Sequence, residues 1–192
     1  MAGAAMALVA SAAAVSASAT ELVTNGGFET GSLSGWTLTG STDHSNVVTS
    51  PVHSGAYAYS NGAVGGAGVL SQVVNTVAGQ SYDFSFWLRN EGGTPNGFTA
   101  SLGNAVLQSF TNVGGSFDFT HFTGTVVAAT NGSTLSFAFR QDPSFWELDD
   151  VSLTSAVGGV PEPASWAMMI TGFLAAGAMI RANRRRQGAV AA

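Results

Sequence analysis

Residues Tyr82–Arg89, YDFSFWLR, alternate between two kinds of side chain. The even-numbered positions are large and apolar, whereas the odd-numbered positions are mostly polar. This period of two is typical of a β-strand that turns one face toward a hydrophobic core. The predicted inward set is Tyr82, Phe84, Phe86 and Leu88, and the predicted outward set is Asp83, Ser85, Trp87 and Arg89. The segment therefore predicts a strand with an exposed tryptophan among polar neighbours.

The same alternation recurs through the middle of the chain. Residues 117–121, 135–140 and 149–153 show it, and glycine turns such as Asn61-Gly62 and Asn131-Gly132 separate the segments. We count roughly eight to ten short strands and no useful amphipathic helix, a pattern typical of an all-β sandwich or barrel. We predict a two-sheet antiparallel jelly-roll sandwich over residues 20–156.

Charge excludes some partners of this middle region. The chain has no cysteine and no lysine, and four of its six arginines lie beyond residue 180. The region 20–156 keeps only Arg89 and Arg140 among the basic residues, against ten acids. Such a surface repels polyanions, so we expect no nucleic acid partner. Neutral ligands and cations remain as possible partners of this region.

Residues 1–19, MAGAAMALVASAAAVSASA, resemble a secretion signal in composition. They are apolar and small, and they end in Ala17-Ser18-Ala19, a small-x-small cleavage pattern. No basic residue precedes the apolar run, which departs from the usual pattern. We predict a signal peptide read by the Sec export machinery. The alternative is an alanine-rich first helix of the folded domain.

A second apolar segment lies near the C-terminus. Ser165–Ile180 has no charge and no proline, and its 16 residues span about 24 Å as a helix, against roughly 30 Å of hydrocarbon. Continuation to Asn183, with Arg181 reaching the membrane surface, makes the length sufficient. We predict a linker at 157–163, a transmembrane helix at 164–183 and a cytoplasmic tail at 184–192, because the arginines favour the inner side. The alternative is a buried core helix followed by a basic tail.

The order of residues in this segment closely resembles the PEP-CTERM protein-sorting signal. The matching elements are Pro161-Glu162-Pro163, Trp166-Ala167-Met168-Met169-Ile170, Gly172-Phe173, and the arginines Arg181, Arg184, Arg185 and Arg186. The resemblance implies export in a Gram-negative bacterium and recognition by a membrane-embedded exosortase, which acts near the Pro-Glu-Pro triplet. It also implies an inner-membrane anchor in transit, followed by release to the outer surface or the extracellular matrix.

The region 20–156 carries a second resemblance, to the galactose-binding-like jelly roll of carbohydrate-binding modules near families 4 and 9. The matching stretches are Val23-Thr24-Asn25-Gly26-Gly27-Phe28-Glu29, Leu33-Ser34-Gly35-Trp36, Val52-His53-Ser54-Gly55-Ala56-Tyr57-Ala58, Ala78–Trp87, and Trp146–Leu153. The resemblance implies that Trp36 packs in the core. It also implies that a structural calcium ion joins the first and last strands.

The positions that match the calcium ligands are Glu29 beside Gly27, with Asp149 or Asp150. Carboxylates and backbone carbonyls are the ligands that calcium prefers. Adjacent strand residues point to opposite faces, so only one of the two aspartates is expected to be a direct ligand. Alternation places Asp149 on the inner side with Val151 and Leu153, which favours Asp149. The alternative is that both acids are solvated ends of a strand.

A sugar-binding surface needs exposed aromatic rings with polar neighbours. Trp87 is the first candidate, together with Arg89 on the same predicted face, and Arg140 and Trp146 are weaker candidates. The alternative for Trp87 is packing beneath a loop. The histidines have no metal-ligand spacing, and no serine lies in a nucleophile elbow. We therefore expect a non-catalytic protein that binds exopolysaccharide. The alternatives are a structural or adhesive matrix protein without sugar binding and a glycan-active enzyme.

Overall fold

The computed structural model describes residues 19–156, 168–175, 177–178 and 181. The chain divides into two units, one formed by Ala19–Val157 and one by the remaining residues, and each is considered by itself. Residues 1–18 of the predicted signal peptide, the linker with its Pro161-Glu162-Pro163 triplet, Trp166 and Arg184–Arg186 lie outside the described residues.

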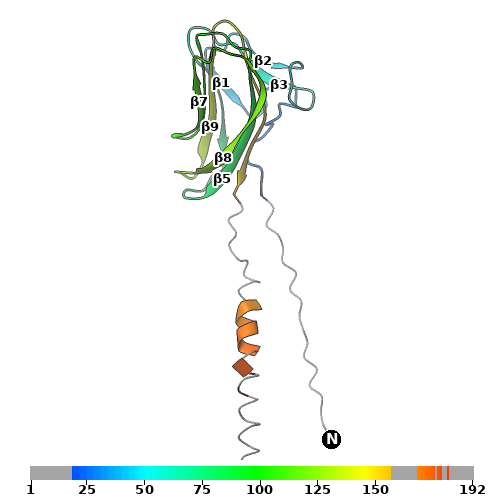
Figure 1. Ribbon diagram of the computed structural model, residues 1–192, viewed down its shortest axis with the longest axis vertical. Helices are drawn as coiled ribbons and strands as arrows, with labels where there is room; N and C mark the ends of the chain where they lie inside the picture. Colours follow the sequence, from blue (N-terminus) through cyan, green and yellow to red (C-terminus); the bar gives the residue numbers. More distant parts are fainter. Residues whose placement is uncertain (1–18, 157–167, 176, 179–180, 182–192) are drawn as a thin grey trace, which may run out of the picture. The chain divides into compact units, whose positions relative to one another are not determined.

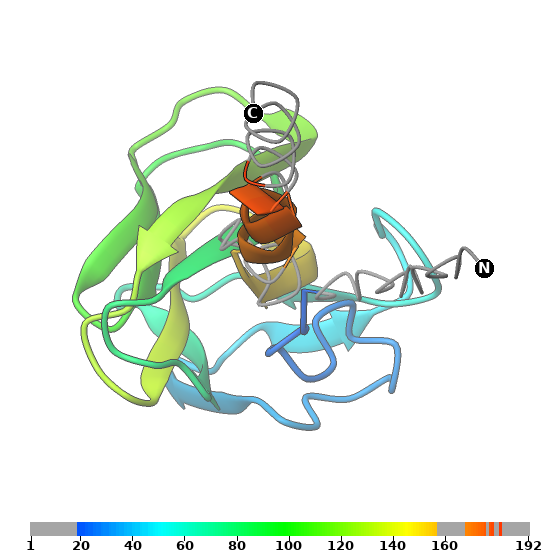
Figure 2. The ribbon, with the colours of Figure 1, turned by 90° about the horizontal axis from the view of Figure 1, so that it is seen from below.

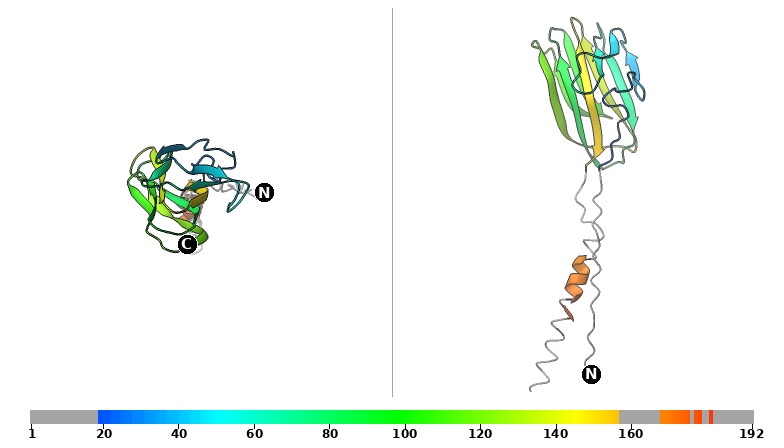
Figure 3. Two further views of the ribbon diagram at one scale, coloured as in Figure 1. Left: turned by 90° about the horizontal axis from the view of Figure 1, so that it is seen from above. Right: turned by 90° about the vertical axis from the view of Figure 1, so that its right-hand side faces the viewer.

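The predicted sandwich is confirmed, since ten strands of the described domain form two five-stranded sheets (Figure 1). One sheet, which we call the β5 sheet, has the order β2-β3-β10-β5-β8. Its strands are β2 (Ser45–Val48), β3 (Ala58–Asn61), β10 (Trp146–Ser155), β5 (Ser81–Asn90) and β8 (Phe117–Val127). All of its pairings are antiparallel, and β10, drawn in yellow, runs through its middle (Figure 3, right).

The second sheet, called here the β9 sheet, has the order β1-β4-β9-β6-β7 and is also antiparallel. Its strands are β1 (Thr37–Gly40), β4 (Gly68–Val74), β9 (Ser133–Gln141), β6 (Asn96–Leu102) and β7 (Ala105–Thr111). Consecutive strands repeatedly change sheets, which is the connection pattern of a jelly roll.

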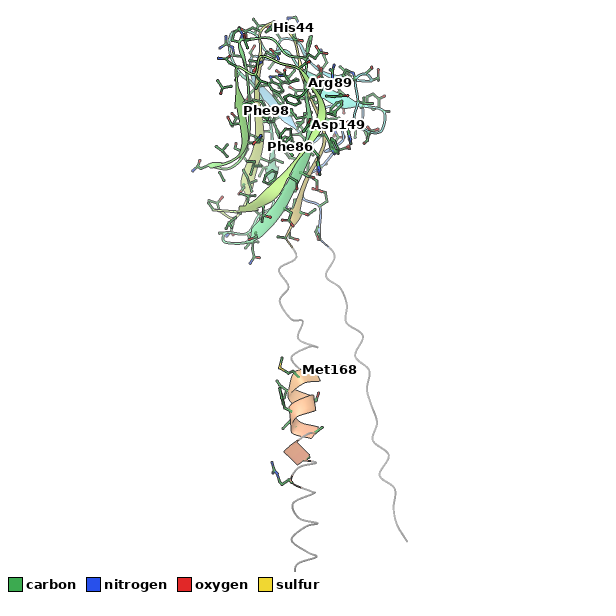
Figure 4. The ribbon with its side chains drawn as sticks, in the orientation of Figure 1. His44, Phe86, Arg89, Phe98, Asp149 and Met168 are labelled. Carbon is green, nitrogen blue, oxygen red and sulfur yellow. The ribbon has the colours of Figure 1, made fainter. Side chains whose placement is uncertain are left out.

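The core between the sheets is rich in aromatic rings. The predicted inward face of β5 is buried, and Phe86 lies 5.7 Å from Phe98 and 5.5 Å from Phe137 between ring centroids. Figure 4 shows Phe86 and Phe98 between the two sheets. Trp36 is buried against Phe28, as expected for a structural residue. Burial of such rings is the main favourable term in folding.

A β-bulge in β10 changes which side chains face the core. Asp149 pairs with Trp87, but the next pair is Ser152 with Ser85, so two residues of β10 oppose one residue of β5. Asp150 takes a left-handed backbone conformation there, with φ 47°. Before the bulge Leu148 faces the core, and after it Leu153 does.

Because of the bulge, the predicted orientation of the Asp149 side chain is wrong. Because cross-strand partners share a face, Asp149 lies on the outer side of the β5 sheet with Trp87, and opposite to Leu153. Simple alternation predicts the opposite, that Asp149 lies on the same side as Val151 and Leu153. The extra residue reverses the alternation, because the side-chain period of a strand is two.

The described helical residues 168–175 belong to the second unit. Their large apolar side chains are exposed, with Phe173 73% and Leu174 67% accessible. Within the described part of the chain, no helix has the length and apolar character needed to cross a bilayer. The predicted span 164–183 lies partly outside the described residues.

We expect Gly26→Ala to destabilise the domain by about 1–3 kcal/mol, the usual cost of overpacking. The carbonyl of Gly26 accepts a hydrogen bond from the Val151 amide at the bulge, at 3.0 Å, and a Cβ at Gly26 would overlap the Val151 carbonyl oxygen. The matched control is Gly66→Ala, since a Cβ at Gly66 meets nothing within 4 Å. Urea denaturation measures both variants, and equal stabilities would contradict the close fit at the bulge.

Candidate functional site

Three carboxylates from the two ends of the domain hold the loop 53–57 against the outer side of the β5 sheet. Asp149 accepts hydrogen bonds from the amides of His53 at 2.9 Å and Ser54 at 3.2 Å. Asp150 binds the His53 ring at 2.6 Å and the Ser54 hydroxyl at 2.9 Å. Glu29 accepts the amides of residues 56 and 57 at 3.0 and 3.1 Å. In Figure 2 the segment that contains this loop is drawn in cyan, at the side of the domain.

Gly55 is the residue that lets this loop approach Glu29 so closely. Its φ is 62°, in the left-handed region that favours glycine. A Cβ at this position would overlap the Glu29 carboxylate. The sequence Ser54-Gly55-Ala56 therefore meets two requirements of the loop at once, a backbone turn and room for a carboxylate.

Asp149 is completely buried beneath the loop 53–57. Burial raises the pKa of its carboxyl, and the charge of Asp150 adds to the rise. The amides of Ser54, His53 and Asp150 oppose it by stabilising the ionised form. The hydrogen bonds thus make a buried acid tolerable, as a buried carboxylate needs partners.

The predicted calcium residues are brought together at this place. A Cβ built on Gly27 would lie 3.4 Å from an Asp150 oxygen, 3.6 Å from the Glu29 Cγ and 3.9 Å from an Asp149 oxygen. Their charge suits a divalent cation, but backbone amides already occupy many of the carboxylate oxygens. In the described part of the chain, no three acidic, histidine or cysteine side chains are arranged to hold a metal ion. Calcium binding stays a prediction.

Trp87 lies on the predicted outer face of β5, between two histidine rings. The His53 ring stacks on it at 3.7 Å between centroids and 14° between planes, and the His121 ring at 4.8 Å and 15°. His121 comes from β8 on one side of β5, whereas His53 comes from the loop bound to β10 on the other side. Trp87 is half-buried and packs beneath the loop 53–57. This packing is the alternative that the sequence left open for Trp87. Its predicted contact with a sugar stays a prediction.

Arg89 is held by carboxylates on the same face. Its guanidinium lies 3.0 Å from both Glu91 and Glu147, and 3.7 Å from Asp118. Glu147 is almost completely buried. Burial raises the pKa of Glu147 from 4.5 to about 7, because it outweighs the opposing effect of Arg89. Figure 4 shows Arg89 and Asp149 on the side of the domain away from the Phe86 and Phe98 core.

The other two predicted ligand-binding residues lie elsewhere. Arg140 is on β9, in the opposite sheet, and forms an ion pair with Asp142 at 2.8 Å. The prediction that Trp146 faces a ligand is wrong, since Trp146 is completely buried and its indole nitrogen donates to the Arg140 carbonyl at 3.0 Å. The physical reason is again the bulge, because Trp146 precedes it and shares the core face of Leu148.

A small cavity between loops at one end of the sandwich was not predicted. Its volume is about 150 Å³. The residues that line it are His44, Gly62, Val64, Gln141, Asp142, Pro143, Ser144 and Phe145. The turn at Asn61-Gly62 was recognisable from the sequence, but its proximity to 141–145 was not, because that depends on the pairing of β3 with β10.

Several solved structures share this fold. The chain resembles TmCBM61 in complex with β-1,4-galactotriose at 19% identity and TM-score 0.55, over 71% of this chain and 99% of that one. It resembles a cyclase from Fischerella sp. TAU at 22% identity and TM-score 0.53, over 72% and 98%. An adhesin domain of Lys-gingipain from Porphyromonas gingivalis w83 matches at 15% identity and TM-score 0.53, over 72% and 100%. At these identities the likeness establishes the fold alone.

Sequence comparison with curated proteins finds no match. A family profile, described as a carbohydrate binding domain, matches residues 20–144. The matched region begins before Glu29 and includes the loop 53–57, β5 and β9, although it ends before the bulge in β10. It covers more than half of the chain, and this protein therefore belongs to the carbohydrate-binding domain family.

Proposed function

We propose that the protein binds a neutral polysaccharide, without catalysis, on the outer face of its β5 sheet. The family match over residues 20–144 is the observation that carries the proposal. The location is supported by the ring stack His53–Trp87–His121, beside which Phe119 lies tilted, at 5.7 Å from His53. Aromatic rings with polar neighbours suit sugars, which present both apolar C–H groups and hydroxyls.

Charge favours a neutral ligand over an acidic one. The two arginines of the described domain are both engaged, Arg89 with Glu91 and Glu147, and Arg140 with Asp142. No basic side chain of that domain other than the histidines is then free to neutralise a sulfate, phosphate or uronate. The host's own exopolysaccharide is the ligand that we propose.

The absence of catalysis is part of the same proposal. Some proteins of this fold are named as cyclases, so the fold does not decide the matter. The acids nearest to the ring stack are occupied, since Asp149 and Asp150 hold the loop 53–57 and Glu147 binds Arg89. These contacts support a structural role for the carboxylates.

We expect Trp87→Ala to weaken polysaccharide binding roughly tenfold or more, because the indole is the centre of the ring stack. Its removal also leaves His53 and His121 without the ring on which they stack. Val127→Ala, an exposed residue far along the same sheet, is the control. Affinity electrophoresis and a glycan array measure both variants, with circular dichroism to confirm folding. Unchanged binding by a folded Trp87→Ala would place the sugar elsewhere, and no glycan binding by the unmodified chain would favour a structural or adhesive matrix role.

The calcium ion is proposed at Glu29, Asp149 and Asp150, where it would join the two ends of the domain. The convergence of carboxylate groups from these residues around Gly27 supports it. We expect calcium at a hundredfold excess over its Kd to stabilise the folded domain by about 2.7 kcal/mol. Thermal unfolding with calcium and with a chelator measures this, and Glu29→Gln should abolish the difference whereas Glu91→Gln should not. Equal unfolding temperatures for the unmodified chain would show that the amide hydrogen bonds hold the loop without metal.

Export and exosortase sorting are proposed from the sequence of the C-terminal segment. The exposed apolar side chains of residues 168–174 support a membrane partner for that segment. Replacement of Pro161-Glu162-Pro163 by alanines should block processing and keep the protein in the inner membrane of an exosortase-bearing host. Replacement of Gly158-Gly159-Val160 by alanines is the control. Cell fractionation with immunoblotting distinguishes them, and normal release of the first variant would contradict the sorting proposal.

A further inference from the structure

The cavity at the end of the sandwich has the features of a binding site that is separate from the ring stack on the β5 sheet. Three loops meet there. The β1–β2 loop supplies His44, and the β3–β4 loop supplies Gly62 and Val64. The β9–β10 turn supplies Asp142 and Phe145. Figure 4 shows His44 at this end of the domain.

The first feature is a buried, unpaired acceptor that belongs to a residue of the cavity wall. Gln141 lines the cavity and is completely buried, and its Nε2 donates to the Asn90 Oδ1 at 2.7 Å. Its Oε1 is the buried side-chain oxygen without a hydrogen-bond partner in the part of the chain that the structure describes. Leaving such an oxygen unpaired is unfavourable, and most buried polar groups have a partner. That oxygen has almost no accessible surface, so a ligand hydroxyl supplies the missing donor only once the Gln141 side chain turns toward the cavity.

The second feature is the combination of apolar and polar walls. Phe145 is 37% accessible, and His44 is exposed on the same cavity. Asp142 is held in place by two bonds from Arg140, at 2.9 and 2.8 Å, and one from the Gly65 amide at 3.1 Å. A fixed carboxylate beside an aromatic ring matches a sugar, whose hydroxyls donate hydrogen bonds and whose C–H face packs on rings. Arg140 would then be a positioning residue.

The size of the cavity and the charge of its lining further restrict the class of ligand. About 150 Å³ is below the roughly 300–1,000 Å³ of sites for drug-sized ligands. The cavity therefore has room for one small ring and not for an oligosaccharide. The residues that line the cavity include no lysine or arginine, and Asp142 contributes negative charge, which favours a neutral ligand over a phosphate or a carboxylate.

We propose that this cavity binds a single neutral sugar residue at the end or a branch of the polysaccharide chain. The inference rests on the proposed carbohydrate binding and adds a second contact point to it. The ring stack on the β5 sheet would contact the length of the chain, whereas the cavity would contact one terminal unit.

Solution NMR of the full chain in detergent, titrated with millimolar galactose, glucose or N-acetylglucosamine, tests the proposal. The test variants are Phe145→Ala, which removes the ring, and His44→Asn, which keeps a residue tolerant of the φ of 60° at this position. The control is Val106→Ala, exposed on β7. We expect one of the sugars to shift the Gln141 side-chain amide signal. Its Kd should rise at least fivefold in both test variants and stay unchanged in the control.

The outcomes separate this site from the general function. Equal sugar affinity in the test variants and the unmodified chain would overturn the cavity site, as would a Gln141 signal that no sugar shifts. If polysaccharide binding persists in those cases, the proposed function stands and the cavity holds only water. Loss of folding in Phe145→Ala, seen as a collapsed amide spectrum, leaves His44→Asn to decide.

Discussion

The capture of the loop 53–57 by Glu29, Asp149 and Asp150 is the interaction on which the outer face of the β5 sheet depends. These acids come from opposite ends of the domain and hold one segment through backbone amides, a hydroxyl and an imidazole. The captured loop in turn places His53 on Trp87. Without this contact, Asp149 would lose both its cover and two of its amide partners, and the indole would lose one of its two covers.

The bulge at Asp150 makes that capture geometrically feasible. An unbulged β10 would keep strict alternation, and Asp149 would then point with Val151 and Leu153 into the core, where a carboxylate finds no amides. The extra residue turns Asp149 outward beneath the loop while Leu148 and Leu153 both stay in the core. It also leaves Trp146 inside, where its ring packs 5.7 Å from Phe98. One inserted residue thus separates the acidic outer face from the aromatic core.

Much of the fold could be predicted because alternation is a local property. Tyr82, Phe84, Phe86 and Leu88 are buried as their spacing indicates, and the glycine turns separate the strands. The bulge could not be predicted this way, because Asp149-Asp150-Val151 reads as ordinary alternation until its partners on β5 are known. The same limit applies to the candidate site. His53, His121 and Trp87 are far apart in the sequence, and only strand order and loop capture bring their rings together. The acids were identified by family resemblance, which preserves a three-dimensional arrangement that local patterns do not contain.

The burial of Glu147 has a calorimetric consequence. The pKa of Glu147 is raised to about 7 in the folded domain from 4.5, so between these values the folded state holds a proton that the unfolded state releases. Its contribution to stability is fully present below pH 4.5 and is lost as the pH rises through 7. Unfolding in this window transfers a proton to the buffer. The measured heat of unfolding therefore includes the ionisation heat of the buffer, and it differs between phosphate and imidazole solutions at the same pH.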